Sequence, residues 1–133
     1  MPHHRRFVAC AVVAEPGALA EARRAITALD LPRETRATLA LLVSELVANS
    51  LRHSRTPFGD PVEVNLTDGT GRLRLAVRDG GHGFRWPVGN HRDPFAAQGQ
   101  GLAIVEALSE TWGVHANGNG CTVWCEVAPE GDP

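Results

Sequence analysis

The chain has 133 residues, of which 43% are hydrophobic, and its formal net charge is −2 at pH 7. This length and composition suffice for one globular domain with a hydrophobic core, and the charge argues against a nucleic-acid binder that relies on a basic face. The sequence contains arginine but no lysine, which excludes a P-loop lysine, a Schiff-base lysine and a lysine general base.

The first expected element is a strand at residues 6–13, where Phe7 and three valines favour extended structure. Basic residues followed by an apolar run also fit a short secretory signal peptide, which stays as the alternative for this region. No segment is long and apolar enough to span a membrane, so we expect a cytoplasmic protein.

Two helices are expected next. Pro16 opens the first, which runs to about Leu29, and Asp30 and Pro32 end it. The second covers residues 33–53. Its apolar arc consists of five aliphatic residues: Leu39, Leu42, Val43, Leu46 and Val47.

The second half of the chain is expected to contribute two hairpins and one more helix. Residues 61–67 and 72–79 alternate as strands joined by a turn at 68–71. Residues 80–98 have no periodic pattern, which in a small domain usually indicates function or mobility. A helix that opens with glycines is expected at 99–113, followed by a hairpin of 114–116 and 121–127. This order predicts an α+β fold.

The long helix carries polar side chains in one row along the edge of its apolar arc. Glu45, Asn49 and His53 recur every four residues, so they fall within an arc of about 80°. Asparagine is a weak helix former and is unusual at such a position. The row is either a solvated edge or the border of a cavity for an oxygen-rich ligand or a metal.

Two glycine clusters flank the aperiodic segment. In the first, Asp79 ends a strand and is followed by Gly81 and Gly83; a carboxylate suits an exocyclic amine, and the glycines let a flat ring approach the backbone. In the second, Gly99 and Gly101 open a helix whose free N–H groups suit a phosphate. A dinucleotide-binding fingerprint is rejected, because its third glycine is missing and a loop precedes it.

In this order the motifs resemble those of the histidine-kinase-like ATPase superfamily, also called GHKL. The N box is matched by ELVANSLRH at 45–53, the two glycine boxes by DGGHG at 79–83 and GQGL at 99–102, and a late threonine box by GCTVW through Thr122. The resemblance covers nearly the whole chain and implies the Bergerat ATP-binding fold. That fold is a two-layer α+β sandwich, with a mixed, mostly antiparallel sheet and three main helices on one face. It also implies a single ATPase domain over residues 1–133 with an ATP lid at 84–98.

The resemblance further implies a role for each matched residue. Glu45 would be the catalytic base, and Asn49 would bind the Mg²⁺ that bridges the phosphates of ATP. Asp79 would bind the adenine amino group, and Thr122 would support that end of the base. The other expected nucleotide contacts are His53, Gly81, Gly83, Gly99, Gln100, Gly101 and Leu102.

Because no sensor or transducer domain accompanies these motifs, the chain is most similar to stand-alone anti-sigma-factor serine kinases, the small actinobacterial ATP-binding regulators. Their partners are a sigma factor and an anti-sigma-factor antagonist. A homodimer is left open, and no direct contact with nucleic acid or membrane is expected. Two departures from these relatives bear on phosphoryl transfer. Many of them carry a basic residue just before the second glycine box, whereas Ala96, Ala97 and Gln98 stand there in this chain and the nearest arginine is Arg92. Cys121 also stands where relatives often have lysine. The alternative function is therefore an ATP-dependent binding module without kinase activity.

Overall fold

The computed structural model describes residues 5–53, 59–69, 71–80, 102–117 and 120–128, and the structural statements below refer to them. The elements in chain order are β1 (Arg5–Val13), α1 (Ala18–Thr27), α2 (Arg33–His53), β2 (Pro61–Asp68), β3 (Leu73–Asp79), α4 (Ala103–Leu108), β4 (Thr111–Asn117) and β5 (Gly120–Val127). This succession confirms the predicted order of strands and helices.

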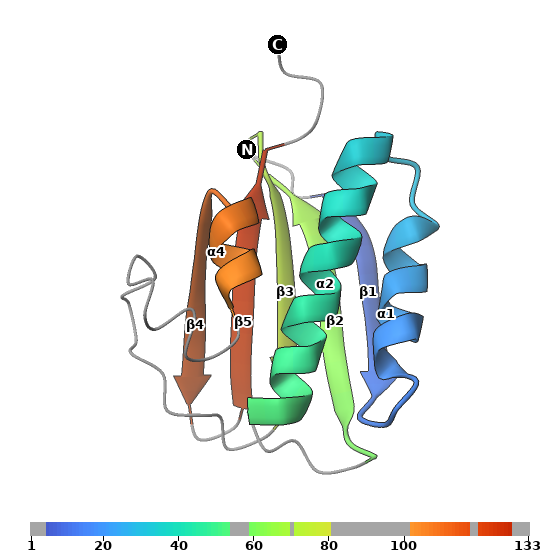
Figure 1. Ribbon diagram of the computed structural model, residues 1–133, viewed down its shortest axis with the longest axis vertical. Coiled ribbons are helices and arrows are strands. Elements are labelled where there is room, and N and C mark those ends of the chain that lie inside the picture. Colours follow the sequence, from blue (N-terminus) through green and yellow to red (C-terminus); the bar gives the residue numbers. More distant parts are fainter. Residues whose placement is uncertain (1–4, 54–58, 70, 81–101, 118–119, 129–133) are drawn as a thin grey trace.

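The strands form one five-stranded sheet in the order β1-β2-β3-β5-β4. Every described pairing is antiparallel, so the sheet is antiparallel throughout its described part and not mixed. Figure 1 shows the helices in front of one face of this sheet, with α1 on the side of β1 and α4 on the side of β4 and β5. The predicted two-layer α+β architecture is thereby confirmed.

Alternation along the strands determines which side chains face the helices. The predicted alternation is present: the buried positions include Val62, Val64 and Leu66 in β2, and Leu73, Leu75 and Val77 in β3. Successive side chains of a strand point to opposite faces, so their neighbours lie on the open face of the sheet. In β5 this alternation places Cys121, Val123 and Cys125 on the helical face, and Thr122 and Trp124 on the open face.

The long helix α2 is central to the core and packs against α1, β3 and α4. Its bounds agree with the prediction, and the five aliphatic residues of its apolar arc are fully buried. α1 adds Ala18, Ala22 and Ile26, which recur every four residues and therefore share one face. Full burial of one large aliphatic side chain contributes about 1.5–3 kcal/mol, more than the differences in intrinsic helix propensity between these residues.

The helix α4 is shorter than expected, since it ends at Leu108 and residues 111–113 belong to β4. Pairing with β5 explains the difference. Trp112 lies opposite Cys125, is almost completely buried, and donates its indole N–H to the carboxylate of Glu106. Burial of this large side chain in the sheet outweighs the helical pattern of the sequence.

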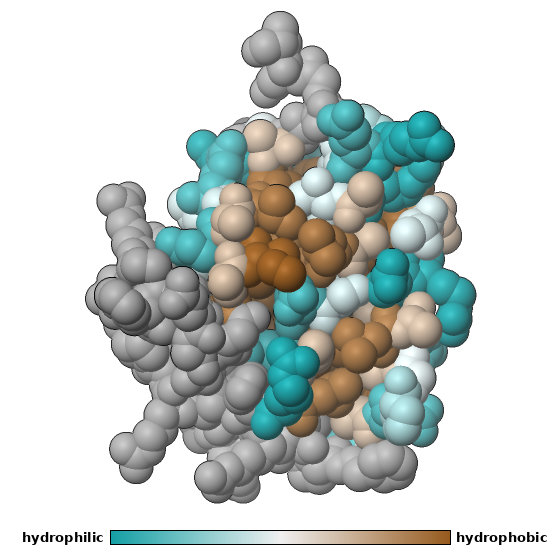
Figure 2. Space-filling view, viewed as in Figure 1, coloured by the Kyte–Doolittle hydropathy of each residue, from teal (hydrophilic) through white to brown (hydrophobic). Residues whose placement is uncertain are grey.

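Some apolar surface remains on the helical side of the molecule. Figure 2 shows it around α2 and α4, where Leu41, Ile104 and Leu108 stay partly exposed. The three cysteines are free thiols, and Cys121 and Cys125 are buried. Among the described helices, none has both the length and the apolar character needed to cross a membrane.

Candidate functional site

The predicted site residues that the structure describes belong to elements that meet at one end of the sheet. Figure 1 shows the C-terminal end of α2 at the end where β3 finishes and β5 begins. Glu45 and Asn49 lie on the C-terminal half of α2, and Asp79 is the last residue of β3. Leu102 directly precedes α4 and is fully buried.

Asn49 is the most unusual of these side chains. It is fully buried, whereas the sequence placed it at the edge of the apolar arc. Neither its amide oxygen nor its amide nitrogen has a hydrogen-bond partner among the described residues. A buried polar group without a partner costs roughly 1–3 kcal/mol. The Asn49 amide therefore opposes folding unless a ligand, or a residue outside the described part of the chain, satisfies it.

Glu45 lies one helical turn before Asn49 and is partly exposed, so its carboxylate is accessible from outside the core. His53 is the last residue of α2, and its side chain is outside the described part of the chain. The remaining predicted contacts and the predicted lid also lie outside it: Gly81, Gly83, Gly99, Gln100, Gly101 and residues 84–98.

Asp79 faces the helical layer, because it continues the buried alternation of β3, and only 3% of it is exposed. Its opposite residue in β5 is Cys121, which is equally buried. Burial, and to a lesser extent the negative charge of Asp79, raise the pKa of the Cys121 thiol to about 11. At neutral pH the pair therefore consists of a carboxyl group and a neutral thiol.

Thr122 lies on the open face of the sheet, between Arg78 of β3 and His115 of β4. The structure thus brings Cys121, and not Thr122, to Asp79. The sequence motif did not indicate that Cys121 lies beside Asp79. The strand alternation of CTVWCEV, in which every second residue is apolar, is the pattern that could have found it.

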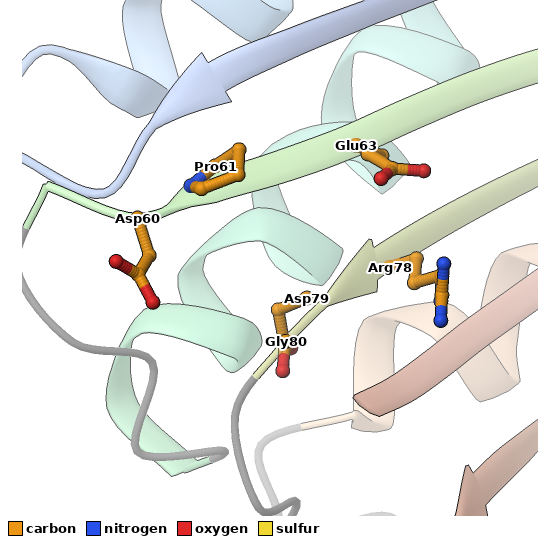
Figure 3. A pocket seen from close by; sticks show the side chains of 6 residues that line it. All are labelled: Asp60, Pro61, Glu63, Arg78, Asp79 and Gly80. Atoms are coloured by element: carbon orange, nitrogen blue, oxygen red, sulfur yellow. The ribbon is translucent and has the colours of Figure 1, made fainter. Parts of the chain in front are cut away.

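A pocket of about 250 Å³ opens at the ends of β2 and β3, and its lining consists of Asp60, Pro61, Glu63, Arg78, Asp79 and Gly80. Figure 3 shows Asp60 and Asp79 at the strand ends, with Glu63 and Arg78 further along the strands. Glu63 and Arg78 are opposite residues on the open face. Among the described residues, Asp79 is therefore the one predicted site residue that lines this pocket. Its volume is below the roughly 300–1,000 Å³ of most ligand clefts, so this pocket alone is not the whole site.

Metal ligands are sparse in the described part of the chain, which contains no group of three or more His, Cys, Asp or Glu side chains placed to hold a metal ion. A hard cation at this end would need oxygen ligands. The amide oxygen of Asn49 offers one of them, and a ligand rich in oxygen atoms would have to bring others.

Comparison with known proteins identifies a family and a solved structure with a similar fold. Residues 12–126 match the family model of the histidine kinase-like ATPase domain. Among solved structures, the chain is similar to the RsbU and RsbW domains of Rv1364c from Mycobacterium tuberculosis, with a TM-score of 0.60 and 19% identity. The match covers 97% of this chain and 32% of that one, so the chain spans about a third of its length. At this identity the likeness shows the fold alone, and no curated protein matches the chain.

Proposed function

The chain belongs to the histidine kinase-like ATPase domain family, and from this premise we propose that it is an ATP-binding regulator that acts as a serine/threonine kinase and anti-sigma factor. In this proposal it holds a sigma factor and phosphorylates an antagonist protein, so that its partners exchange. The observation that carries nucleotide binding is the fully buried amide of Asn49, which has no hydrogen-bond partner among the described residues.

The described residues offer groups that can bind both the phosphate end and the adenine end of magnesium ATP. Bound ATP supplies the phosphoryl group to be transferred, and Mg²⁺ offsets the charge of its phosphates. Asn49 provides a hard oxygen ligand of the kind that Mg²⁺ prefers. The carboxylate of Asp79 accepts a hydrogen bond from the amino group of adenine, whereas it would face a carbonyl oxygen in guanine.

Glu45 is suited to the role of general base. It is partly exposed, so a substrate hydroxyl can reach it, and it lies on the same helix face as Asn49, about 6 Å away along the helix. A base at this position would remove the proton of the attacking hydroxyl, and Asn49 would hold the Mg²⁺ that offsets the charge of the phosphates.

The transferring phosphoryl group also requires positive charge. No described residue of the sheet that faces the helical layer at this end is an arginine, since Arg78 lies on the open face. Arg52, near the C-terminal end of α2, is exposed. We therefore assign this charge to Arg92, which is outside the described residues, or to an arginine of the partner. The isolated protein should accordingly turn over little ATP. The lack of such a positive charge among these residues also favours a second function, an ATP-dependent binding module without kinase activity.

Calorimetric titration with ATP, with and without Mg²⁺, tests the proposal. We expect ATP binding that Mg²⁺ strengthens, and we expect Asn49→Ala to weaken the magnesium complex far more than metal-free binding. Asn65→Ala is the matched control, because Asn65 is a half-buried asparagine of β2 on the open face. Absence of ATP binding, or equal affinity with and without Mg²⁺, would overturn the proposal.

A further inference from the structure

The sheet has one face that none of the described helices covers. These helices all lie against the other face (Figure 1). The open face presents the side chains that alternate with the buried ones along each strand. Because an antiparallel sheet can expose one polar face to water, the composition of the open face indicates whether it is solvated or covered.

The edge strand β1 is apolar on both of its faces. Residues 7–14 read FVACAVVA and include no charged residue. Ala9, Ala11 and Val13 lie on the open face, where all three are exposed, and 42% of Val13 is accessible to solvent. Near-continuous apolar runs are typical of strands that are buried on both faces. At β1 the open face therefore has the composition of a covered surface.

Two opposite charges on this face are adjacent but unpaired. Glu63 of β2 and Arg78 of β3 are direct cross-strand neighbours, and both are exposed. No ion pair joins them among the described residues, in contrast to Arg74 and Glu126, which are paired across β3 and β5. The Nε atom of Arg78 lies 3.6 Å from the position of a Cβ atom at Gly120, so this side chain leans toward β5 and away from Glu63. Each charge is thus accessible to an opposite charge on another molecule.

We propose that the open face is the interface of a homodimer, in which two copies of the chain pack sheet against sheet. This inference goes beyond the proposed function and does not depend on it. A twofold axis that runs parallel to the strands, between β2 and β3, generates the arrangement. It places β2 of each chain over β3 of the other, so that Glu63 of each chain meets Arg78 of the other. Such an interface is isologous, and each charge pair occurs twice.

The same axis places a small side chain over a large one. β1 and β5 are the second strands on either side of the axis, and Ala9 and Trp124 lie in one cross-strand row. The Trp124 ring lies over Gly113, where a Cβ atom would be 2.8 Å from it, and the Cζ atom of Arg74 is 4.1 Å from the ring centre. Trp124 is therefore held in place before association. Tryptophan and arginine are enriched among the side chains that dominate interface energies.

The overlapping part of the face is large enough for a dimer. The axis superposes the strands β1, β2, β3 and β5, which have seven to nine residues each. At about 3.3 Å per residue and about 4.8 Å between strands, their footprint is roughly 500 Å². The accessible area of protruding side chains exceeds this footprint. A specific interface requires about 500 Å² or more from each partner.

Charge reversal tests the pairing, with the oligomeric state measured by sedimentation equilibrium without nucleotide. The wild type should be a dimer at micromolar concentration. Glu63→Arg and Arg78→Glu should each raise the dimer dissociation constant by about tenfold or more, because each brings like charges together twice. The double variant should return to within about threefold of wild type. Glu34→Arg is the control, since Glu34 is an exposed residue of α2 in the helical layer.

A second variant tests the face without a change of charge. Ala9→Gln should also favour the monomer, because its longer side chain would meet Trp124 of the second copy. Ala20→Gln is the matched control, since Ala20 is an exposed alanine of α1 in the helical layer. Thermal melting verifies that the variants fold.

The possible results decide the inference. A wild-type protein that stays monomeric at the highest concentration measured overturns it and leaves the open face to a different protein. A dimer that neither charge reversal weakens, or that the double variant does not restore, overturns the pairing of Glu63 with Arg78. If a charge-reversal variant does not fold, Ala9→Gln decides: a dimer of wild-type affinity would exclude this face.

Discussion

Gly120 at the start of β5 lies so close to the end of β3 that a Cβ atom added to it would be 2.5 Å from the backbone carbonyl oxygen of Asp79. This contact is with backbone, so no side chain can move aside to relieve it. The absence of a side chain at residue 120 therefore permits the close approach of the two strands. It is this approach that places Asp79 and Cys121 opposite each other.

Gly120→Ala should reduce the free energy of unfolding by about 1–3 kcal/mol, because the added methyl group forces β3 and β5 apart. It should also weaken ATP binding, since Asp79 would shift. Urea unfolding and calorimetry measure these two effects. Gly80→Ala is the control for unfolding at the same end of the sheet, because a Cβ atom there would meet no described residue within 4 Å. Equal unfolding midpoints for the two variants would contradict the prediction.

Asn49→Leu should stabilise the nucleotide-free protein while it abolishes magnesium-dependent binding. Leucine removes a buried amide that has no partner among the described residues, and such a group costs roughly 1–3 kcal/mol. Urea unfolding without nucleotide measures the gain. Asn65→Leu, on the open face, should change little. If Asn49→Leu instead destabilises the protein, the amide of Asn49 has a partner within the folded chain.

Asp79→Ala should reduce the affinity for ATP by a factor of about ten to a hundred, because a buried hydrogen bond to a charged group contributes roughly 1.5–3 kcal/mol. Asp79→Asn should also lose affinity for ATP, since the carboxamide presents a donor where the carboxylate presents two acceptors. Titrations with ATP and GTP measure both effects. Unchanged ATP affinity in folded Asp79→Ala would show that the adenine lies elsewhere.

Glu45→Ala should abolish phosphoryl transfer to the cognate antagonist and leave ATP binding nearly unchanged, because a general base acts on the substrate hydroxyl and not on the nucleotide. The assay uses labelled ATP with the purified partner, followed by mapping of the phosphorylated site. Glu34→Ala, an exposed glutamate in the first turn of the same helix, is the control. Transfer that persists in Glu45→Ala would remove Glu45 from the chemistry. ATP-dependent partner binding without any transfer would favour the binding module.

Stability should decline as the pH rises from about 9 to about 11. The sequence has no lysine and no tyrosine, so the cysteines are the main side chains that titrate in this range. Burial raises the pKa of Cys121 and of Cys125 from an ordinary value near 9.0 to about 11. In this window the folded chain keeps the thiol protons and the unfolded chain loses them, so the stabilisation is complete below pH 9 and is lost toward pH 11.

The measurement is the free energy of unfolding in urea at several pH values between 8 and 11. The double variant Cys121→Val, Cys125→Val removes both titrating thiols, and its stability should fall less steeply with pH than that of the wild type. Parallel pH profiles for the two proteins would show that these thiols do not keep their protons on folding.

The local spacing of apolar residues in the sequence was sufficient to predict most of the fold. The aliphatic spacing in α2, with Pro32 before it, determined a helix of 21 residues at 33–53, because a 3.6-residue period can bury only one face. Alternation at Val62, Val64 and Leu66 likewise determined which face of β2 is buried. These features depend on neighbours in sequence, and a single chain displays them directly.

Tertiary contacts decided the rest, because they depend on partners that are distant in sequence. Trp112 is part of a strand since its ring is buried opposite Cys125, although its own segment resembles the end of a helix. Asn49 is fully buried since α1, β3 and α4 surround α2. The motif in the sequence pointed to Thr122, but the register between β3 and β5 places Cys121 beside Asp79, and a shift of one residue exchanges the two faces of a strand.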